Sequence, residues 1–142
     1  MTIEELINAE GDNIEFKLDL PQKDIDFLKT VVAFSNGQGG KIVFGIRNED
    51  HVVIGMDNET LFQDIDTITN IIADNCEPVI LPSVYPQTIG GKTIIVAQIP
   101  VGRQRPYYVK KLGMMEGTFI RISAETRQAP EYMIKELMFE GS

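Results

Sequence analysis

The sequence predicts one α+β domain over residues 1–142, with about four helices and a mixed, largely antiparallel sheet. Three observations lead to this fold class. The length of 142 residues suits one domain, for which roughly 100–200 residues is usual. Segments with helical spacing of apolar residues are interspersed with short apolar runs that end at glycines and polar turns. No repeat and no linker interrupts these segments, so a single core is expected.

The N-terminal segment is expected to form a helix and then a strand. Residues 2–9 carry Thr2 as an N-cap and Glu5 three positions later, the two halves of a capping box. After a glycine turn, apolar and polar residues alternate over residues 14–18, which predicts a half-buried strand.

A second helix and a buried strand are predicted around a glycine cluster. Apolar residues recur on one helical face from Lys23 to Asn36, and Gly37 stands where a helix-ending C′ residue is expected. The consecutive apolar run over 41–46 indicates a strand that is covered on both faces. Residues 52–55 are expected to return as its hairpin partner.

The remaining elements alternate in the same way. A helix beginning at Leu61, capped by Thr60 or Asn58, must end before Pro78. Gly90 and Gly91 form a tight-hairpin signal. The other predicted elements are strands over 83–88, 92–99, 107–109 and 118–122, with Met114 and Met115 in a loop, and a last helix that opens at Pro130.

Charge is segregated along the chain. The net charge is −8, which argues against nucleic-acid binding over the whole surface, because phosphates are neutralised by Lys and Arg. Residues 1–91 carry 5 basic and 16 acidic side chains, whereas residues 92–127 carry 7 basic and 2 acidic ones, a local charge of +5.

This basic part of the chain also carries aromatic residues. Guanidinium and ammonium groups bind phosphates, and tyrosine rings stack on unpaired bases, so the pattern indicates a nucleic-acid surface. The alternative is a solvated loop with two core tyrosines. The candidate binding residues are Arg103, Arg105, Tyr107, Tyr108, Lys110, Lys111, Arg121 and Arg127.

The glycine cluster could have a chemical role. Gly37, Gly39 and Gly40 with Lys41 could offer backbone donors to a phosphate, but the spacing fits neither phosphate-loop motif and equally suits a helix stop followed by a strand.

Glu10 and Glu15 could hold a divalent cation with Lys17 beside the phosphate; the alternative is a surface ion pair.

The remaining candidates point to a cytoplasmic protein without nucleophilic catalysis. Cys76 is the only cysteine and cannot form an internal disulfide, and we expect it to be buried. His51 is the only histidine, lies in a polar turn, and is expected at the surface. No apolar run approaches the ~20 residues of a spanning helix, so no membrane partner is expected.

Five ordered blocks resemble the Schlafen AlbA-type domain of bacterial and archaeal transcriptional regulators. The entry strand reads Glu-Gly-Asp-Asn-Ile-Glu-Phe-Lys over 10–17, and residues 33–46 are similar to the family's AFANxxGGxxxxGV block. Residues 105–108, 117–121 and 126–129 resemble its last two strands and the step into the final helix.

The resemblance implies a nucleic-acid-binding module, in bacteria commonly placed before an ATPase-like or winged-helix region. We therefore expect either a stand-alone module or the N-terminal part of a longer regulator whose effector domain is absent from this chain. Some Schlafen members cleave RNA with two glutamates and an aspartate around a metal. Glu10 and Glu15 match the glutamates, whereas Gly45-Ile-Arg-Asn48 stands where relatives often read Gly-Val-Asp-Asp, leaving Asp50 as the substitute.

The favoured hypothesis is a non-catalytic module that binds DNA or RNA, with DNA binding in a transcriptional regulator as its most specific form and a homodimer as a further expectation. It requires no cofactor. The first alternative is an endoribonuclease that uses Mg²⁺ or Mn²⁺ at Glu10, Glu15 and Asp50. The second is ATP binding at Gly37–Gly40.

Overall fold

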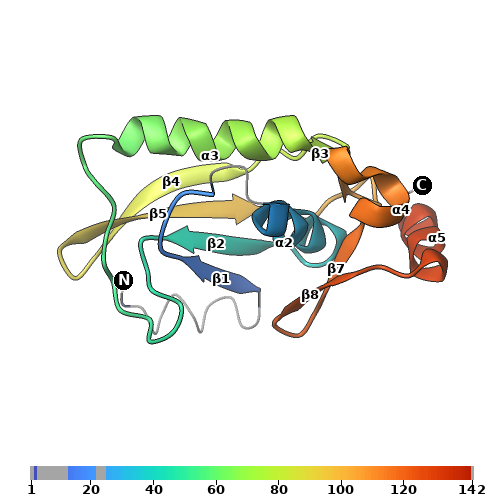
Figure 1. The fold of residues 1–142 in the computed structure, drawn as a ribbon, viewed down its shortest axis with the longest axis horizontal. Coiled ribbons are helices and arrows are strands. Elements are labelled where there is room, and N and C mark those ends of the chain that lie inside the picture. The colour runs from blue at the N-terminus through green and yellow to red at the C-terminus, as the bar shows by residue number, and fades with distance from the viewer. Residues whose placement is uncertain (1, 3–12, 22–24, 142) are drawn as a thin grey trace.

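The computed structural model describes residues 2, 13–21 and 25–141. The predicted helix over 2–9 and the residue Glu10 lie outside the described residues, apart from Thr2. The elements follow in the order β1 (Ile14–Lys17), α2 (Ile25–Asn36), β2 (Gly40–Phe44), α3 (Leu61–Asn75), β3 (Cys76–Glu77), β4 (Ser83–Ile89), β5 (Lys92–Ile99), β6 (Tyr108–Val109), η1 (Lys110–Leu112), α4 (Gly113–Gly117), β7 (Phe119–Ile122), β8 (Glu125–Gln128) and α5 (Glu131–Glu140) (Figure 1).

A four-stranded sheet forms the centre of the fold, in the order β1-β2-β5-β4. The β1–β2 pair is parallel, and the β2–β5 and β5–β4 pairs are antiparallel. Two small antiparallel pairs, β3–β6 and β7–β8, lie beyond the end of this sheet. The predicted α+β class with a mixed, largely antiparallel sheet is confirmed.

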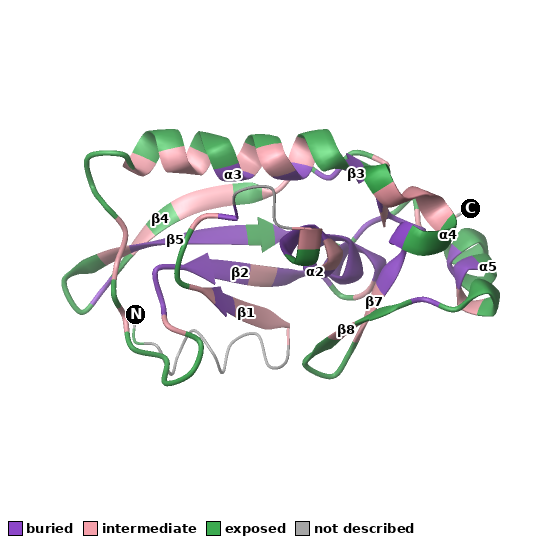
Figure 2. Cartoon of the chain, in the orientation of Figure 1, coloured by how far each residue is buried: buried purple, intermediate pink, exposed green. Residues whose placement is uncertain are grey.

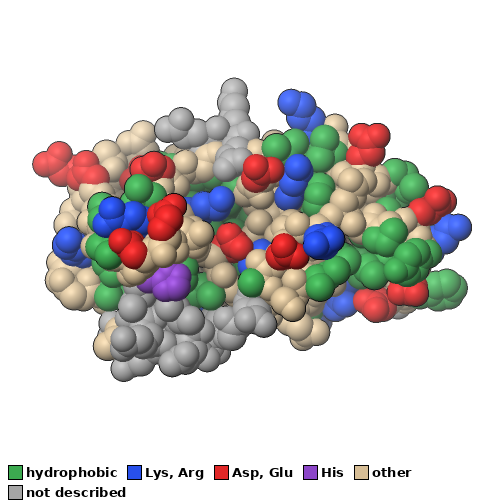
Figure 3. All heavy atoms as spheres, turned by 60° about the horizontal axis from the view of Figure 1, so that its bottom comes forward, with side chains coloured by type: hydrophobic (Ala, Val, Ile, Leu, Met, Phe, Trp, Pro, Cys, Tyr) green, Lys and Arg blue, Asp and Glu red, His purple; other side chains and the backbone are tan. Residues whose placement is uncertain are grey.

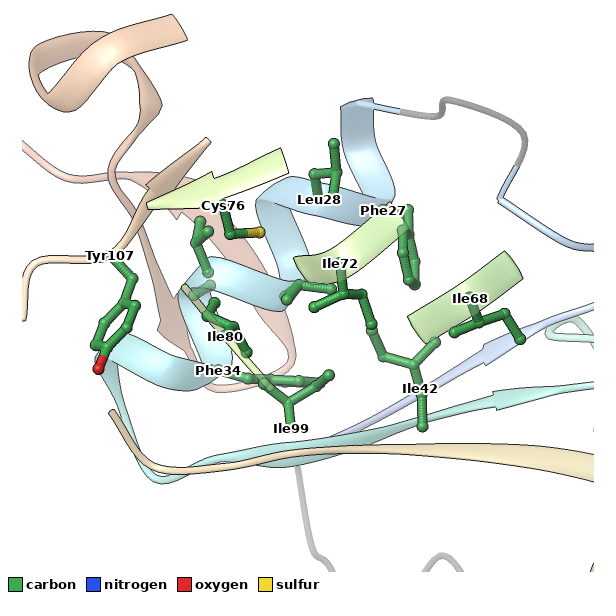
Figure 4. Packing of buried hydrophobic residues seen from close by; sticks show 14 of the residues in the cluster. Phe27, Leu28, Phe34, Ile42, Ile68, Ile72, Cys76, Ile80, Ile99 and Tyr107 are labelled. Carbon is green, nitrogen blue, oxygen red and sulfur yellow. The ribbon is translucent and has the colours of Figure 1, made fainter. Parts of the chain in front are cut away.

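Helices α2 and α3 cover one face of the sheet (Figure 1). Phe27 from α2 and Ile68 and Ile72 from α3 lie around Ile42 of the sheet, and Phe34 from α2 lies beside Ile99 (Figure 4). All of these residues are buried. The outer side of α3 is exposed, whereas β2 and most of β5 are buried (Figure 2). Burial of this apolar stripe, at about 25 cal/mol per Å² of apolar surface, stabilises the helix layer.

The opposite face of the sheet carries a second buried cluster. Phe16 of β1, Val43 of β2, and Ile94 and Val96 of β5 belong to it. Because side chains alternate along a strand, the consecutive apolar runs of β2 and β5 place residues in both clusters. The prediction of a strand covered on both faces is confirmed at β2.

The last residue of α2 joins three segments of the fold. The side-chain amide of Asn36 donates to the carbonyl oxygens of Tyr107, at 2.8 Å, and Phe119, at 2.9 Å. Its carbonyl oxygen accepts from the N–H of Tyr107 at 2.7 Å. Asn36 is buried, so these three bonds replace hydration that the amide has lost.

The glycines after α2 serve the turn into β2. Gly39 has a φ of +77°, in the left-handed region, whereas no positive φ occurs at Gly37, which was expected to take that conformation. A Cβ at Gly40 would lie 2.8 Å from the Asn13 carbonyl oxygen and from the Phe34 ring. Close packing of β2 against β1 and α2 therefore requires glycine there.

Two local predictions were wrong, and strand β8 was missed. The expected strand over 52–55 is reduced to a single bridge, Ile46 to Val53, because the N–H groups of Ile54 and Gly55 both donate to the Gly45 carbonyl instead of continuing a ladder. The methionine loop lies in α4, a short helix over Gly113–Gly117. Strand β8 was not expected, because its sequence Glu-Thr-Arg-Gln lacks an apolar alternation.

Replacement of Asn36 should strongly destabilise the domain. Asn36→Ala leaves buried backbone groups without partners, at ~1–3 kcal/mol each, so we expect the free energy of unfolding to fall by at least about 3 kcal/mol. Urea denaturation measures this change. Asn48→Ala, in an exposed turn, is the matched control and should change stability by less than ~0.5 kcal/mol. Equal effects of the two substitutions would contradict this role for Asn36.

Candidate nucleic-acid interface

The basic segment, residues 103–111, passes along three hollows in the molecular surface. Arg103 and Gln104 line a hollow of about 290 Å³ next to Val79 and Val101. Gln104 also lines the next hollow, of about 320 Å³, together with Tyr108. Further along, Val109 and Lys111 line a groove of about 530 Å³ between α2 and α3. The segment thus forms part of the wall of each hollow.

Three cations of the basic segment are available to a ligand. Arg103, Lys110 and Lys111 are exposed, and none of them forms an ion pair with a residue that the structure describes. They occupy the two ends of the segment. Exposed, unpaired cations can neutralise phosphates without first breaking an internal contact.

Arg105 and Tyr107 have internal roles instead. Arg105 donates from Nε to the Gly102 carbonyl and from a terminal nitrogen to Glu140, both at 2.9 Å. Tyr107 is 7% exposed, and its hydroxyl oxygen accepts bonds from the backbone N–H groups of Arg103 and Gln104. Figure 4 shows Tyr107 at the border of the core cluster. Stacking and packing were the two roles expected for Tyr107. Its burial shows that it packs.

Tyr108 lies between the free cations and is half-buried. Its hydroxyl donates to a carboxylate oxygen of Glu77 at 2.9 Å. This hydrogen bond raises the pKa of Tyr108 above its ordinary value, with desolvation and the charge of Glu77 adding in the same direction. The phenol is therefore neutral at physiological pH, and its hydroxyl is hydrogen-bonded across the β3–β6 pair.

The arginines of the β7–β8 hairpin do not extend this surface. The Arg121 side chain is 5% exposed, pairs with Glu15 at 2.7 Å, and lies over the Phe34 ring at 5.0 Å. Its Nε is buried without a hydrogen-bond partner. Arg127 is exposed and pairs with Glu125. A phosphate would have to displace Glu15 to reach the buried Arg121 guanidinium, whereas the Arg127 side chain is 62% exposed.

The described residues do not assemble the metal site that the family resemblance implies. Glu15 is engaged by Arg121, and Asp50 accepts bonds from Arg47 and from the backbone N–H of Val52. Within residues 2, 13–21 and 25–141, no three His, Cys, Asp or Glu side chains are grouped so as to hold a metal ion. Lys17 lies on the same face of β1 as Glu15. Glu10 lies outside the described residues.

The glycine turn has little to offer a phosphate. The N–H groups of Gly37 and Gly39 both donate to the Phe34 carbonyl, and that of Lys41 donates to the Asn13 carbonyl. An anion-binding nest requires N–H groups that point outwards unpaired. The turn therefore acts as the helix stop and strand entry that was the alternative interpretation of this cluster.

Three cations of residues 92–127, namely Arg105, Arg121 and Arg127, are paired with carboxylates. Figure 3 shows acidic and basic side chains interleaved over the face it presents.

His51 is exposed, and Cys76 is buried with its pKa raised by desolvation to about 12, so both predicted placements are confirmed. Sequence reasoning missed Glu77 and Gln104 as lining residues, because nothing in the chain order places residue 77 beside residue 108.

The chain matches the Schlafen, AlbA_2 family over residues 10–130. It belongs to this family. The expected resemblance, which rested on the five sequence blocks, is thereby confirmed.

This AlbA_2 chain is similar to longer proteins. It is 35% identical over 75 residues to UU034, an uncharacterised ATP-binding protein of Ureaplasma parvum, which corresponds to 48% of this chain and 21% of that protein. The chain thus spans about a fifth of that relative's length.

Two solved structures share the fold. The DIP2311 protein of Corynebacterium diphtheriae has a TM-score of 0.67 at 14% identity, over 94% of this chain and 30% of that one. The second structure is the N-terminal domain of a RecG-related protein of Nitrosomonas europaea, which is named for an ATP-dependent DNA helicase. Its TM-score is 0.59 at 23% identity, and the match covers 87% of this chain and 88% of that domain. At these identities the likeness concerns the fold.

In the part of the chain that the structure describes, no helix has the length and apolar character needed to cross a bilayer.

The pair of Glu15 and Arg121 should stabilise the AlbA_2 fold. Glu15→Gln leaves the buried guanidinium without its counter-ion, so we expect a loss of about 2–4 kcal/mol in the free energy of unfolding. Glu125→Gln makes the same change in an exposed pair and should cost less than ~1 kcal/mol. Chemical denaturation of both variants tests this. If the two losses are the same, the Glu15 pair has no special structural role.

Proposed function

We propose that this chain is a nucleic-acid-binding module that contacts phosphates through the basic segment. The observation that carries the proposal is a set of exposed cations, Arg103, Lys110 and Lys111, that form no ion pair with any described residue and flank Tyr108 in the sequence. Cations position a nucleic acid through its backbone, and an aromatic ring between them supplies a stacking surface. DNA binding in a transcriptional regulator is the more specific form of this proposal.

The acidic remainder of the chain supports a localised interface. Helix α3 contains Asp64, Asp66 and Asp74 and no basic residue. This acidic helix repels phosphates, so a polyanion is directed to the basic segment at the other side of the α2–α3 groove. The net charge of −8 is therefore compatible with binding at one site and opposes nonspecific coating of the molecule.

The names of relatives are consistent with a role near nucleic acid. The Nitrosomonas protein that contains a similar domain is named for a DNA helicase. The proposed assembly is a module that works beside a second, effector domain, with a homodimer as an alternative way to enlarge the interface.

Binding should depend on salt in the way that phosphate contacts require. The logarithm of the affinity for a short oligonucleotide should fall linearly with the logarithm of the salt concentration, and each phosphate-binding cation that is removed should reduce the slope by ~0.7–0.9. The variants are Arg103→Gln, Lys110→Gln and Lys111→Gln, measured by fluorescence anisotropy.

Lys92→Gln is the matched control, because it removes the same charge from the β4–β5 hairpin at the far end of the sheet (Figure 1). It should leave the slope unchanged. A salt-independent affinity, or no binding of DNA or RNA at low salt, removes the proposal.

Nucleotide binding is the second candidate, and the name of the Ureaplasma relative favours it. ATP that binds the folded state should raise the melting temperature progressively with ligand concentration. Thermal melts across an ATP series, with adenosine as the uncharged control, measure the effect. A melting temperature that is independent of ATP removes this candidate. Metal-dependent RNA cleavage has less support, because Arg121 occupies the Glu15 carboxylate.

A further inference from the structure

The hollow beside Tyr108, called here the Tyr108 hollow, has the lining of a small-molecule site. It is a shallow, open hollow of about 320 Å³ bordered by β3, β6, the loop before β6, α4 and α5. This volume is at the lower end of the range for ligand sites, roughly 300–1,000 Å³. The lining residues are Glu77, Pro78, Gln104, Arg105, Pro106, Tyr108, Met114 and Met138.

Several lining residues of the Tyr108 hollow form contacts within the domain. Tyr108 is opposite Glu77 in the β3–β6 register and donates its hydroxyl hydrogen bond to that carboxylate. Arg105 is held by the Gly102 carbonyl and by Glu140, and the backbone N–H of Gln104 donates to the Tyr107 hydroxyl. A preorganised site loses little conformational entropy when a ligand binds.

The chemistry of the hollow suits a flat, neutral and polar-edged group. Two prolines, two methionines and Tyr108 are among its lining residues, together with Glu77 and Gln104, whose side chains carry hydrogen-bonding groups. A phosphate is disfavoured there, because Glu77 repels it and the charge of Arg105 is already paired with Glu140. Heteroaromatic rings with N–H donors at their edges meet these conditions.

The hollow lies beside the basic segment, and this position indicates that the ring is a nucleobase. Arg103 and Lys110 are the nearest unpaired cations of the segment on either side of Tyr108 in the sequence, and both are exposed. Gln104 and Tyr108, which line the hollow, are close neighbours of these cations in the chain, so a strand whose phosphates contact Arg103 or Lys110 passes near it. A base in a duplex is stacked and paired, so only an unpaired base can enter.

We propose that the Tyr108 hollow is a subsite for one unpaired nucleobase, so that the chain prefers single-stranded to double-stranded nucleic acid. This inference rests on the proposed function. Single-stranded DNA and single-stranded RNA share the chemistry, and the ribose hydroxyl distinguishes them.

Four fluorescent probes with equal numbers of phosphates test the preference: single-stranded DNA, single-stranded RNA, a DNA hairpin duplex, and a DNA strand in which every base is replaced by an abasic site. We expect at least one single strand to bind roughly tenfold or more tightly than the duplex and the abasic strand, as base stacking on an aromatic side chain implies. The tighter of the two single strands identifies the ligand. The abasic probe leaves the protein unaltered, so its result does not depend on how a variant folds.

Two variants then locate the base. Tyr108→Leu keeps apolar bulk but removes the aromatic face, and it should weaken single-strand binding by about tenfold without changing the salt slope. Tyr108→Phe keeps the ring and should bind within about twofold of the unaltered chain. Circular dichroism melts check that both variants are folded.

The outcomes separate the two proposals. Equal affinity for all four probes, with a salt slope that still responds to Arg103→Gln, overturns the base subsite and leaves the proposed function intact. Absence of binding by every probe at low salt overturns both. If Tyr108→Leu lowers the affinity for the single strand and also reduces the salt slope, the subsite is contradicted as well. A smaller slope means that this position contacts a phosphate.

Discussion

The buried amide of Asn36 is the contact on which the placement of the candidate interface depends. It ends α2, and its three hydrogen bonds hold the backbone at Tyr107 and Phe119. These two residues begin the path of β6 and β7, so the basic segment and the β7–β8 hairpin are both positioned from one side chain at the end of a core helix. A polar group in this position is costly to bury and must be fully bonded, which makes the junction specific as well as stable.

The basic residues of the second half of the chain divide into two groups with different physical roles. Arg105 and Arg121 are inserted between elements and paired with carboxylates, and Arg121 also covers the Phe34 ring. The cations of η1 and Arg103 extend into solvent. Charge segregation in the sequence therefore reflects both the internal cross-links of the β7–β8 and α5 regions and a group of solvent-exposed cations.

The same division explains why the candidate site is smaller than the sequence suggested. Glu15 belongs to the resemblance with RNA-cleaving Schlafen proteins, yet here its carboxylate completes an ion pair with a residue 106 positions away. The glycine turn is likewise used internally, since its N–H groups close the α2–β2 connection. Among the described candidate residues, the exposed cations of the short basic segment are the ones without an ion-pair partner in the described part of the chain.

The sequence by itself determined the α+β class, the main helices and long strands, the tight hairpin at Gly90–Gly91, whose glycines both have positive φ, and membership of the AlbA_2 family. These follow from local periodicity, turn chemistry and ordered motifs, which are properties of neighbouring residues. Only the tertiary structure decided that Tyr107 packs in the core while Tyr108 borders a hollow. It also decided that Arg121 forms an ion pair with Glu15 and that Glu77 pairs with Tyr108 in the β3–β6 register. Partners in such contacts are chosen by packing and charge compensation between segments far apart in the chain, and a linear pattern does not encode which distant residue will meet a given side chain.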